Sequence, residues 1–378
     1  MFLNRFSSRS IKLSVNVLYK IRSSNYCKEF QIDSSPLNPG RLNFYKKAFY
    51  AFLFTGVVSV AWFSKKRSEK RSELIREATR LNSKIGRMTM YRFRDFIIPE
   101  EVLKLIPQLS SIQFNSNDVI LCSFPKTGVT WLQEIVWLIM NDYDFNKALN
   151  INLEERSPFL EWIMPGISGI NKMPSPRLIK THLPLSILFN QETKIEPKVI
   201  SITRNPKDVV VSYYFFARMN KLIDYNDSVS EFAERFLSGE VPYGPLHKHY
   251  IDCLKYSLVE GNKVLLISYE DLHEDFEKNV HRICNFLDQP LPDDKTMSRL
   301  KEHCNFRFMA VNPQVNYSHW DRIGLRNPDE SQFFRNGQVG DWTNHLIEPI
   351  AIKMDKHIQL HLSDLFKFKD KITKSQST

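Results

Sequence analysis

Short apolar runs alternate with segments of helical periodicity through the central part of the chain. Four runs are short and rich in β-branched residues, the pattern of strands buried on both faces of a sheet, at 118–123, 177–181, 198–203 and 263–268. Segments 130–141 and 206–218 carry apolar residues at helical spacing, and the chain after 268 is mainly helical in pattern. Strands separated by helices predict an α/β fold with a central, mainly parallel sheet flanked by helices.

The same pattern sets the expected domain boundaries. A single domain is predicted over residues 88–370, and the Ser, Thr and Lys-rich residues 371–378 are expected to form a frayed tail. Residues 1–87 form an N-terminal extension of different composition. Within it, residues 48–64 carry no charged side chain, which meets the lower length limit of a membrane span, and residues 68–85 predict a short stem helix.

Charge separates the extension from the domain. Residues 1–87 contain 18 Lys or Arg against 5 Asp or Glu, whereas residues 88–378 contain 34 against 37, a balance of −3 (34 minus 37). A basic nucleic-acid-binding surface is therefore not expected on the domain. The first 28 residues hold six basic residues, six serines and no acid, which is typical of a mitochondrial transit peptide. Basic clusters on both sides of 48–64 favour a membrane anchor, and a helix lying on the membrane surface or on the domain is the alternative.

The cysteines indicate a reduced protein without a zinc site. They are odd in number, widely scattered and never in C-x-x-C spacing, at positions 27, 122, 253, 284 and 304. An odd number of scattered cysteines argues against a disulfide framework, and the lack of C-x-x-C pairs argues against a zinc site. We therefore expect free thiols and no metal.

Candidate chemistry begins directly after the first predicted strand, where residues 124–131 read FPKTGVTW. The turn would direct free backbone N–H groups and the positive end of the following helix toward a bound anion, and phosphate suits both. Lys126 adds a full positive charge. A Walker A loop needs its lysine after a second glycine, but Lys126 precedes the only glycine, Gly128, so a kinase or ATPase is not predicted.

Two further strands deliver polar residues at their carboxyl ends, the edge where ligands bind in open α/β sheets. Lys180 and His182 follow the second strand, and His182 is a candidate general base because imidazole titrates near neutrality. A histidine in this place is also commonly structural. Arg204 precedes a helix that carries Ser212 two turns later, and the pair can converge on a phosphate. The alternative is a solvated arginine and a serine on the helix face.

In this order the segments resemble the motifs of the cytosolic sulfotransferases, which use 3′-phosphoadenosine 5′-phosphosulfate (PAPS) as sulfonate donor. PKTGVTW at 125–131 resembles their 5′-phosphosulfate loop, and KTHLP at 180–184 resembles the motif whose histidine deprotonates the acceptor. RNGQVGDW at 335–342 resembles the R-K-G-x-x-G-D-W segment. The resemblance covers residues 90–365 and implies a single α/β domain with a P-loop-like phosphosulfate loop.

The resemblance also implies the contacts of PAPS. It assigns the 3′-phosphate to Arg204, Ser212 and the loop that begins at Arg335, and it places Trp131 against the adenine. Aromatic residues of this kind are as often core residues. The full set of expected nucleotide contacts is Lys126, Thr127, Gly128, Val129, Thr130, Trp131, Arg204, Ser212, Tyr269, Cys304, Phe306, Arg335, Asn336 and Gly337.

The implied reaction is transfer of the sulfonate group of PAPS to the hydroxyl or amine of a small apolar acceptor, such as a phenol or a sterol-like alcohol. His182 would take the acceptor proton, and Lys126 with Lys180 would stabilise charge on the leaving bisphosphate without a metal. The segment SPFLEW resembles a family segment that lines the acceptor site. Phe159, Trp162 and His182 are therefore the expected acceptor contacts.

The chain departs from the family pattern in several places, one of which is Cys304 where a threonine is usual. Val129 stands where threonine is usual and Asn336 where lysine is usual, so each removes one side-chain contact to a phosphate and a modest loss of affinity is expected. The family dimer motif is not matched, because its positions hold Thr343, Ile347, Glu348 and Ile352. The family dimer is therefore not expected to transfer.

Two alternative functions stay open. A PAPS-binding or PAP-binding module (PAP being the bisphosphate product) with weak or no catalysis would keep the four motifs. A membrane-anchored, Golgi-type sulfotransferase acting on carbohydrate or protein would explain residues 48–64 and the sequons at Asn226 and Asn316, although the cysteines and the KTHLP motif speak against it. The resemblance favours a cytoplasmic enzyme, and the extension favours a membrane-anchored or mitochondrial one.

Overall fold

The computed structural model of the chain describes residues 77–162, 164–189 and 196–372. The candidate membrane segment 48–64 and the transit-peptide-like start lie outside the described residues, so their predictions stay predictions. Within the described ranges no helix combines the length and apolarity that a membrane crossing requires.

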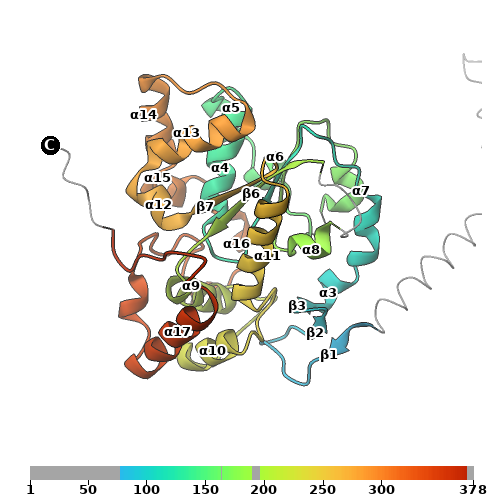
Figure 1. The fold of residues 1–378 in the computed structure, drawn as a ribbon, viewed down its shortest axis with the longest axis vertical. Coiled ribbons are helices and arrows are strands. Elements are labelled where there is room, and N and C mark those ends of the chain that lie inside the picture. Colours follow the sequence, from blue (N-terminus) through green and yellow to red (C-terminus); the bar gives the residue numbers. More distant parts are fainter. Residues whose placement is uncertain (1–76, 163, 190–195, 373–378) are drawn as a thin grey trace, which may run out of the picture. The chain divides into compact units, whose positions relative to one another are not determined.

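The centre of the domain is a four-stranded parallel sheet in the order β5-β4-β6-β7 (Figure 1). This sheet confirms the predicted fold class. Its strands lie where the apolar runs predict them, with bounds β4 Val119–Cys122, β5 Leu178–Thr181, β6 Lys198–Thr203 and β7 Val264–Ser268. Because all four strands are parallel, their carboxyl ends meet at one edge of the sheet.

Helices cover both faces of this sheet. On one face lie α4 (Val129–Met140), α13 (Phe276–Leu287) and α14 (Asp294–His303). On the other lie α9 (Pro206–Met219) and α11 (Leu246–Val259). The predicted helices at 130–141 and 206–218 are thus confirmed to within one residue.

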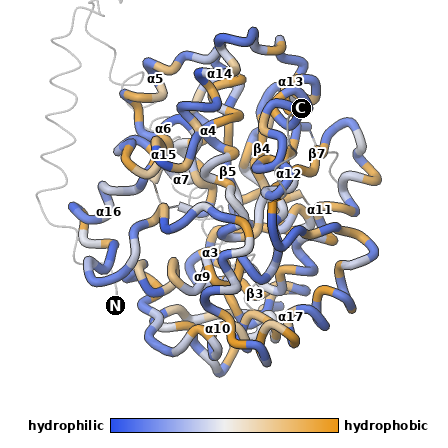
Figure 2. The backbone as a smooth tube through the Cα atoms, turned by 90° about the vertical axis from the view of Figure 1, so that its left-hand side faces the viewer, coloured by the Kyte–Doolittle hydropathy of each residue, from blue (hydrophilic) through white to orange (hydrophobic). Residues whose placement is uncertain are grey.

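The strands are apolar throughout because both faces are buried. Along β4, Val119 and Leu121 pack into the core shared with α4, whereas Ile120 and Cys122 pack into the core shared with α9 and α11. Successive side chains of a strand point to opposite faces, so a run without polar residues fits only a strand covered twice. Figure 2 shows hydrophobic residues along the interior strands and hydrophilic residues in the outer loops.

An antiparallel sheet precedes the parallel one, and it differs from the sequence prediction. Its strands are β1 (Thr79–Arg80), β2 (Met90–Phe93) and β3 (Phe96–Pro99). Residues 79–85 therefore form a strand and a loop where a stem helix was expected, and residues 68–76 lie outside the described residues. Pairing with β2 and full burial of Ile85 outweigh a helical periodicity that is too short to be stable alone.

The remaining elements are mostly short and connect the layers. In chain order they are α3 Glu100–Leu103, η2 Ile106–Ser111, α5 Phe145–Asn150, α6 Leu153–Arg156, α7 Gly166–Ile170, α8 Leu185–Leu188, α10 Val229–Leu237, α12 Tyr269–Glu274, α15 Phe306–Val311, α16 His319–Arg322, η3 Asp341–Asn344 and α17 Glu348–His361. The loops after β4, β5, β6 and β7 all face one cavity, which holds the candidate site.

Candidate active site

A cavity of about 840 Å³ lies at the carboxyl edge of the sheet. Of the residues expected to contact nucleotide or acceptor, all but Thr127 line it. They come from distant parts of the chain and are Lys126, Gly128, Val129, Thr130, Trp131, Phe159, Trp162, Lys180, His182, Arg204, Ser212, Tyr269, Cys304, Phe306, Arg335, Asn336 and Gly337. One cavity therefore joins the two sets of residues that the sequence suggests.

The loop between β4 and α4 has the shape of an anion-binding turn. Gly128 is the N-cap of α4 with a φ of 104°, and a Cβ there would lie 2.5 Å from Cδ2 of Tyr269, so only glycine fits. No side chain caps the first turn of α4, which leaves its N–H groups available to a ligand. The side chain of Thr127 is buried, and its hydroxyl donates to the carbonyl of Phe124 at 2.9 Å. Thr127 thus supports the loop from inside.

Lys126 is a half-buried lysine whose ammonium group faces aromatic rings. Its Nζ lies 4.7 Å from the ring centre of Phe216 and 4.2 Å from that of Phe333, and among the described residues it forms no ion pair with a carboxylate. Burial lowers the pKa of the Lys126 ammonium to about 7, and repulsion from Lys180, Arg204 and Arg335 acts in the same direction. A bound anion would restore the charge, so the site favours an anionic ligand.

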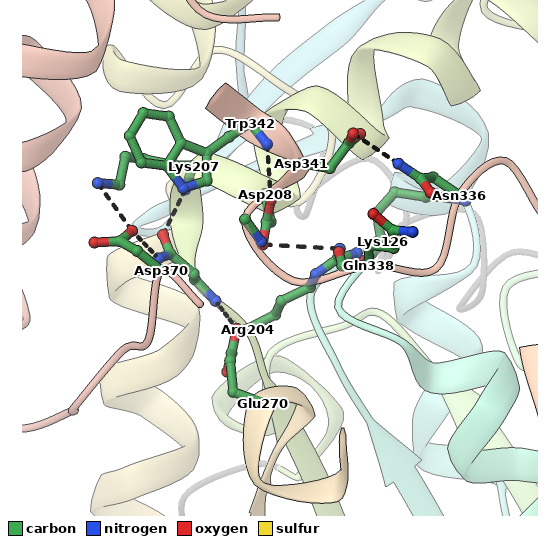
Figure 3. A network of polar contacts seen from close by, with 12 residues as sticks. Lys126, Arg204, Lys207, Asp208, Glu270, Asn336, Gln338, Asp341, Trp342 and Asp370 are labelled. Carbon is green, nitrogen blue, oxygen red and sulfur yellow. Dashed lines mark hydrogen bonds and ion pairs between the residues drawn. The ribbon is translucent and has the colours of Figure 1, made fainter. Parts of the chain in front are cut away.

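Arg204 directly follows β6, and one of its side-chain N–H groups has no hydrogen-bond partner among the described residues. Its Nη2 donates to the carbonyl of Gln338 at 3.0 Å (Figure 3), and its guanidinium lies 4.2 Å from the ring centre of Tyr269. Its Nε is buried and has no hydrogen-bond partner among the described residues. Asp208 accepts from the backbone N–H groups of Gly340 and Trp342, at 2.8 and 3.0 Å. An oxyanion beside Arg204 would meet a positioned and incompletely paired guanidinium.

The loop 335–338 closes the same side of the cavity. Arg335 pairs with Asp341, and Asn336 donates to the same carboxylate at 2.6 Å (Figure 3). Gly337 has a φ of 69°, and a Cβ there would lie 2.1 Å from the Phe306 ring. The side chain that replaces the usual family lysine is therefore used to hold the loop.

Trp131 lies in an aromatic corner suited to a flat base. Its ring centre is 4.7 Å from that of His273, 5.6 Å from Tyr269 and 6.1 Å from Phe276, to which it is nearly parallel. The indole Nε1 is buried without a hydrogen-bond partner among the described residues. Cys304 and Phe306 line the cavity as well. This corner fits adenine both by stacking and by an unused donor.

The tautomer of the His182 imidazole suits a general base. Its Nδ1 lies 2.7 Å from the backbone carbonyl of Ser123, and because a carbonyl only accepts, Nδ1 carries the proton and Nε2 is free to take one. Burial lowers the pKa of the imidazole well below its usual range, and the neighbouring charges of Lys180 and Lys126 lower it further. The ring is therefore neutral at physiological pH.

Aromatic side chains surround His182. Its ring centre lies 5.0 Å from that of Phe159 and 5.4 Å from that of Tyr243, and Trp162 stacks on Trp320 at 6.3 Å. Lys180 lies 4.7 Å from the ring centre of Phe159, and burial lowers the pKa of its ammonium to about 8. This wall is apolar with a few polar groups at its centre, as small-molecule sites are.

Several lining residues escape the sequence interpretation: Phe216, Phe333, Tyr243, His273 and Trp320. Phe216 had a usable signal, because it stands four residues after Ser212 and so lies on the same face of α9. For the others the sequence offers no comparable pattern.

Comparison with known proteins agrees with this geometry. A family model described as a sulfotransferase domain matches residues 116–367. Sulfotransferase 1E1 of Bos taurus is 33% identical over 295 residues, which cover 76% of this chain and 96% of the relative. Sulfotransferase 1B1 of Canis lupus familiaris is 37% identical over 240 residues, covering 62% and 80%.

Among solved structures, retinol dehydratase in complex with androsterone and inactive cofactor PAP has the same fold. The match has a TM-score of 0.69 and 24% identity, and it covers 79% of this chain and 96% of the other. The match over most of the domain, with the motifs in family order around one cavity, leaves no other assignment: the chain belongs to the cytosolic-type, PAPS-dependent sulfotransferase family.

Proposed function

We propose that the chain transfers the sulfonate group of PAPS to the hydroxyl or amine of a small apolar acceptor. The observation that carries the proposal is the placement of two groups on one cavity: the imidazole of His182 with its free Nε2, and the ammonium of Lys126 without a counter-charge among the described residues. The first suits the acceptor proton, and the second suits the leaving phosphate.

The residues present fit PAPS at each of its parts. The spare Nε of Arg204, with Ser212 and Arg335, would hold the 3′-phosphate, and the corner at Trp131 would hold the adenine. The turn at Lys126 would hold the 5′-phosphosulfate. When bound, PAPS supplies a sulfonate on a bisphosphate leaving group.

In the proposed reaction, different residues of the chain carry out proton transfer, charge stabilisation and the exclusion of water. His182 accepts at Nε2 the proton of the acceptor hydroxyl while that oxygen bonds to sulfur and the bond from sulfur to the bridging phosphate oxygen breaks. Lys126, assisted by Lys180, neutralises the charge that develops on the departing oxygen. Phe159, Trp162 and Tyr243 exclude water from the acceptor side. The products are a sulfated acceptor, PAP and a proton.

An acceptor screen tests this function. The full chain would be assayed with labelled PAPS against phenols, sterol-like alcohols, amines, a charged sugar and a tyrosine peptide, beside calorimetric titration with PAP. Transfer to the small apolar acceptors supports the proposal. PAP binding without transfer to any acceptor would instead identify a binding module, and transfer only to sugar or peptide would identify a Golgi-type enzyme.

Nucleotide binding is expected to take up protons. At pH 8 Lys126 is largely neutral in the free enzyme, because its pKa is about 7, and it becomes charged beside the phosphates of PAP, which are already fully ionised. Affinity should therefore weaken as the pH rises above 7, and Lys126 should take up about one proton on binding at pH 8. Lys180, with a pKa of about 8, adds to this uptake. Calorimetric titration with PAP at pH 8, in two buffers of different ionisation enthalpy, measures this proton uptake. Binding heats that do not depend on the buffer would contradict the predicted uptake.

For location, we propose a cytoplasmic catalytic domain that the N-terminal extension attaches to a membrane. The proposal rests on the cytosolic relatives and on the uncharged run 48–64 between basic clusters. Cell fractionation with carbonate extraction, of the full chain and of a form lacking residues 1–76, tests it. An extension-dependent membrane fraction supports attachment, and matrix-protected protein with a shortened N-terminus would support mitochondrial import instead.

A further inference from the structure

Glu161 is a buried carboxylic acid that the mechanism above does not use. It follows the acceptor-lining residue Phe159 and is 7% exposed. Its Oε1 accepts two backbone N–H groups, from His182 at 2.6 Å and from Leu183 at 3.0 Å. Its Oε2 is sealed from solvent and has no hydrogen-bond partner among the described residues.

The two bonds on Oε1 bear directly on the imidazole. The residue His182 is fastened at three points: its backbone N–H by Glu161, its Nδ1 by the carbonyl of Ser123, and its carbonyl oxygen by Nε2 of His249 at 3.1 Å. Of these three bonds, only the one that Glu161 accepts has a carboxyl oxygen as acceptor and lies on the backbone beside the ring. When the carboxyl group is ionised, such a bond is charge-assisted and strong.

The location of this carboxyl group costs free energy that core packing does not explain. Burial raises the pKa of Glu161 to about 7, while the N–H of His182, the hydroxyl of Thr181 and the charge of Lys180 lower it. Tyr243, which packs on the His182 ring, and the thiol of Cys122 also face it. A buried acid with one oxygen unpaired is expensive, and such costs concentrate at functional sites.

We propose that Glu161 is a positioning residue, which fixes the backbone at His182 and Leu183 and thereby aims the imidazole at the acceptor hydroxyl. This inference rests on the proposed function, because it assigns a purpose to the orientation of the His182 base. Glu161 lines the cavity, but in this role it acts through the backbone of His182 and Leu183, so its removal affects the rate of transfer and not the binding of acceptor or nucleotide.

The central test replaces Glu161 by alanine, glutamine and aspartate in the full chain. Glu161→Ala leaves the buried N–H of His182 without an acceptor, whereas the N–H of Leu183 keeps the hydroxyl oxygen of Thr181 at 3.0 Å. A displacement of about 1 Å at the base is expected to lower kcat about 100-fold. The KM for the acceptor and the affinity for PAP should stay at wild-type values. Glu161→Gln keeps an oxygen at the same reach and should restore most of kcat, whereas Glu161→Asp is one methylene too short and should restore little.

The value of kcat is calculated per PAP-binding site, so that unfolded protein does not contribute to it. Glu134→Gln is the matched control, because Glu134 is also buried and is bonded to Arg156 at 2.8 Å and to His303 at 2.7 Å but does not contact His182. It should lower the melting temperature and leave kcat per site unchanged. A wild-type kcat per site in Glu161→Ala would overturn the proposal. If Glu161→Ala does not fold, a higher kcat per site in Glu161→Gln than in Glu161→Asp supports the proposal. A kcat per site in Glu161→Asp equal to that of wild type overturns it.

A second readout separates this proposal from the proposed function. If wild-type enzyme binds PAP but transfers nothing, the function is wrong, and nitrogen NMR of the His182 imidazole decides the role of Glu161 alone. Loss of the single Nδ1–H tautomer in Glu161→Ala or Glu161→Asp, with its retention in Glu161→Gln, supports positioning. An unchanged imidazole spectrum in all three variants contradicts it.

Discussion

Replacing His182 by alanine is expected to lower kcat by about 10²- to 10⁴-fold, the range that a positioned general base contributes. The reason is the orientation of the ring: Nδ1 is committed to the carbonyl of Ser123, so Nε2 is the proton acceptor, and burial keeps it neutral. PAP affinity should be unchanged, because the proposed contacts to the 3′-phosphate and the adenine are those of Arg204 and Trp131. Steady-state turnover with labelled PAPS, beside calorimetric titration with PAP, measures both quantities.

His281→Ala is the matched control for this experiment. His281 lies on α13, which packs on the opposite face of the sheet from α9, and it is not among the residues that line the cavity. The control should retain wild-type turnover. A His182→Ala enzyme with near-normal kcat would show that another group removes the acceptor proton.

Replacing Lys126 by methionine is expected to lower kcat/KM by about 10²- to 10³-fold, as the loss of one preorganised charge-stabilising donor does elsewhere. Methionine keeps a flexible apolar chain against Phe216 and Phe333, so the loop should keep its shape. The variant should also bind PAP more weakly and lose most of the proton uptake at pH 8.

Lys172→Met is the corresponding control, since Lys172 is an exposed lysine that does not line the cavity. Turnover and calorimetry of the two variants separate a local effect from a change in overall charge. Wild-type kcat/KM in Lys126→Met would exclude Lys126 as the group that stabilises the leaving phosphate.

The sequence predicts the sheet well because each strand is determined locally. In β6, every residue after Lys198 is buried, so the apolar run and the strand have the same bounds. Helix α9 begins at Pro206, where the missing N–H of proline costs nothing. Short-range patterns of this kind do not depend on knowing the rest of the fold.

The stem helix shows the opposite case. Residues 79–85 have a weak helical stripe, but Thr79 pairs with Arg92 of β2 and Ile85 enters the core, and both partners lie beyond the segment itself. A weak local preference yields to tertiary contacts that the sequence does not display.

The candidate site divides in the same way. Lys126, His182 and Arg204 follow strands, and parallel strands bring their carboxyl ends together, so their meeting could be predicted. Phe333 and Tyr243 line the same cavity from loops, and hydrophobic periodicity does not predict the path of a loop. The partners of Asn336 and Glu161 also depend on side-chain directions, which become visible only in the folded chain.

The proposed function requires that a single cavity carry the sulfonate group of PAPS to an apolar acceptor. A single-turnover experiment tests it most directly: enzyme in excess over PAPS labelled with ³⁵S is mixed with an apolar phenol, and label and PAP are followed together. Label is expected to appear on the phenol in equal amount to the PAP formed and at the same rate. Bound PAPS whose label never reaches a phenol, sterol-like alcohol or amine would contradict it.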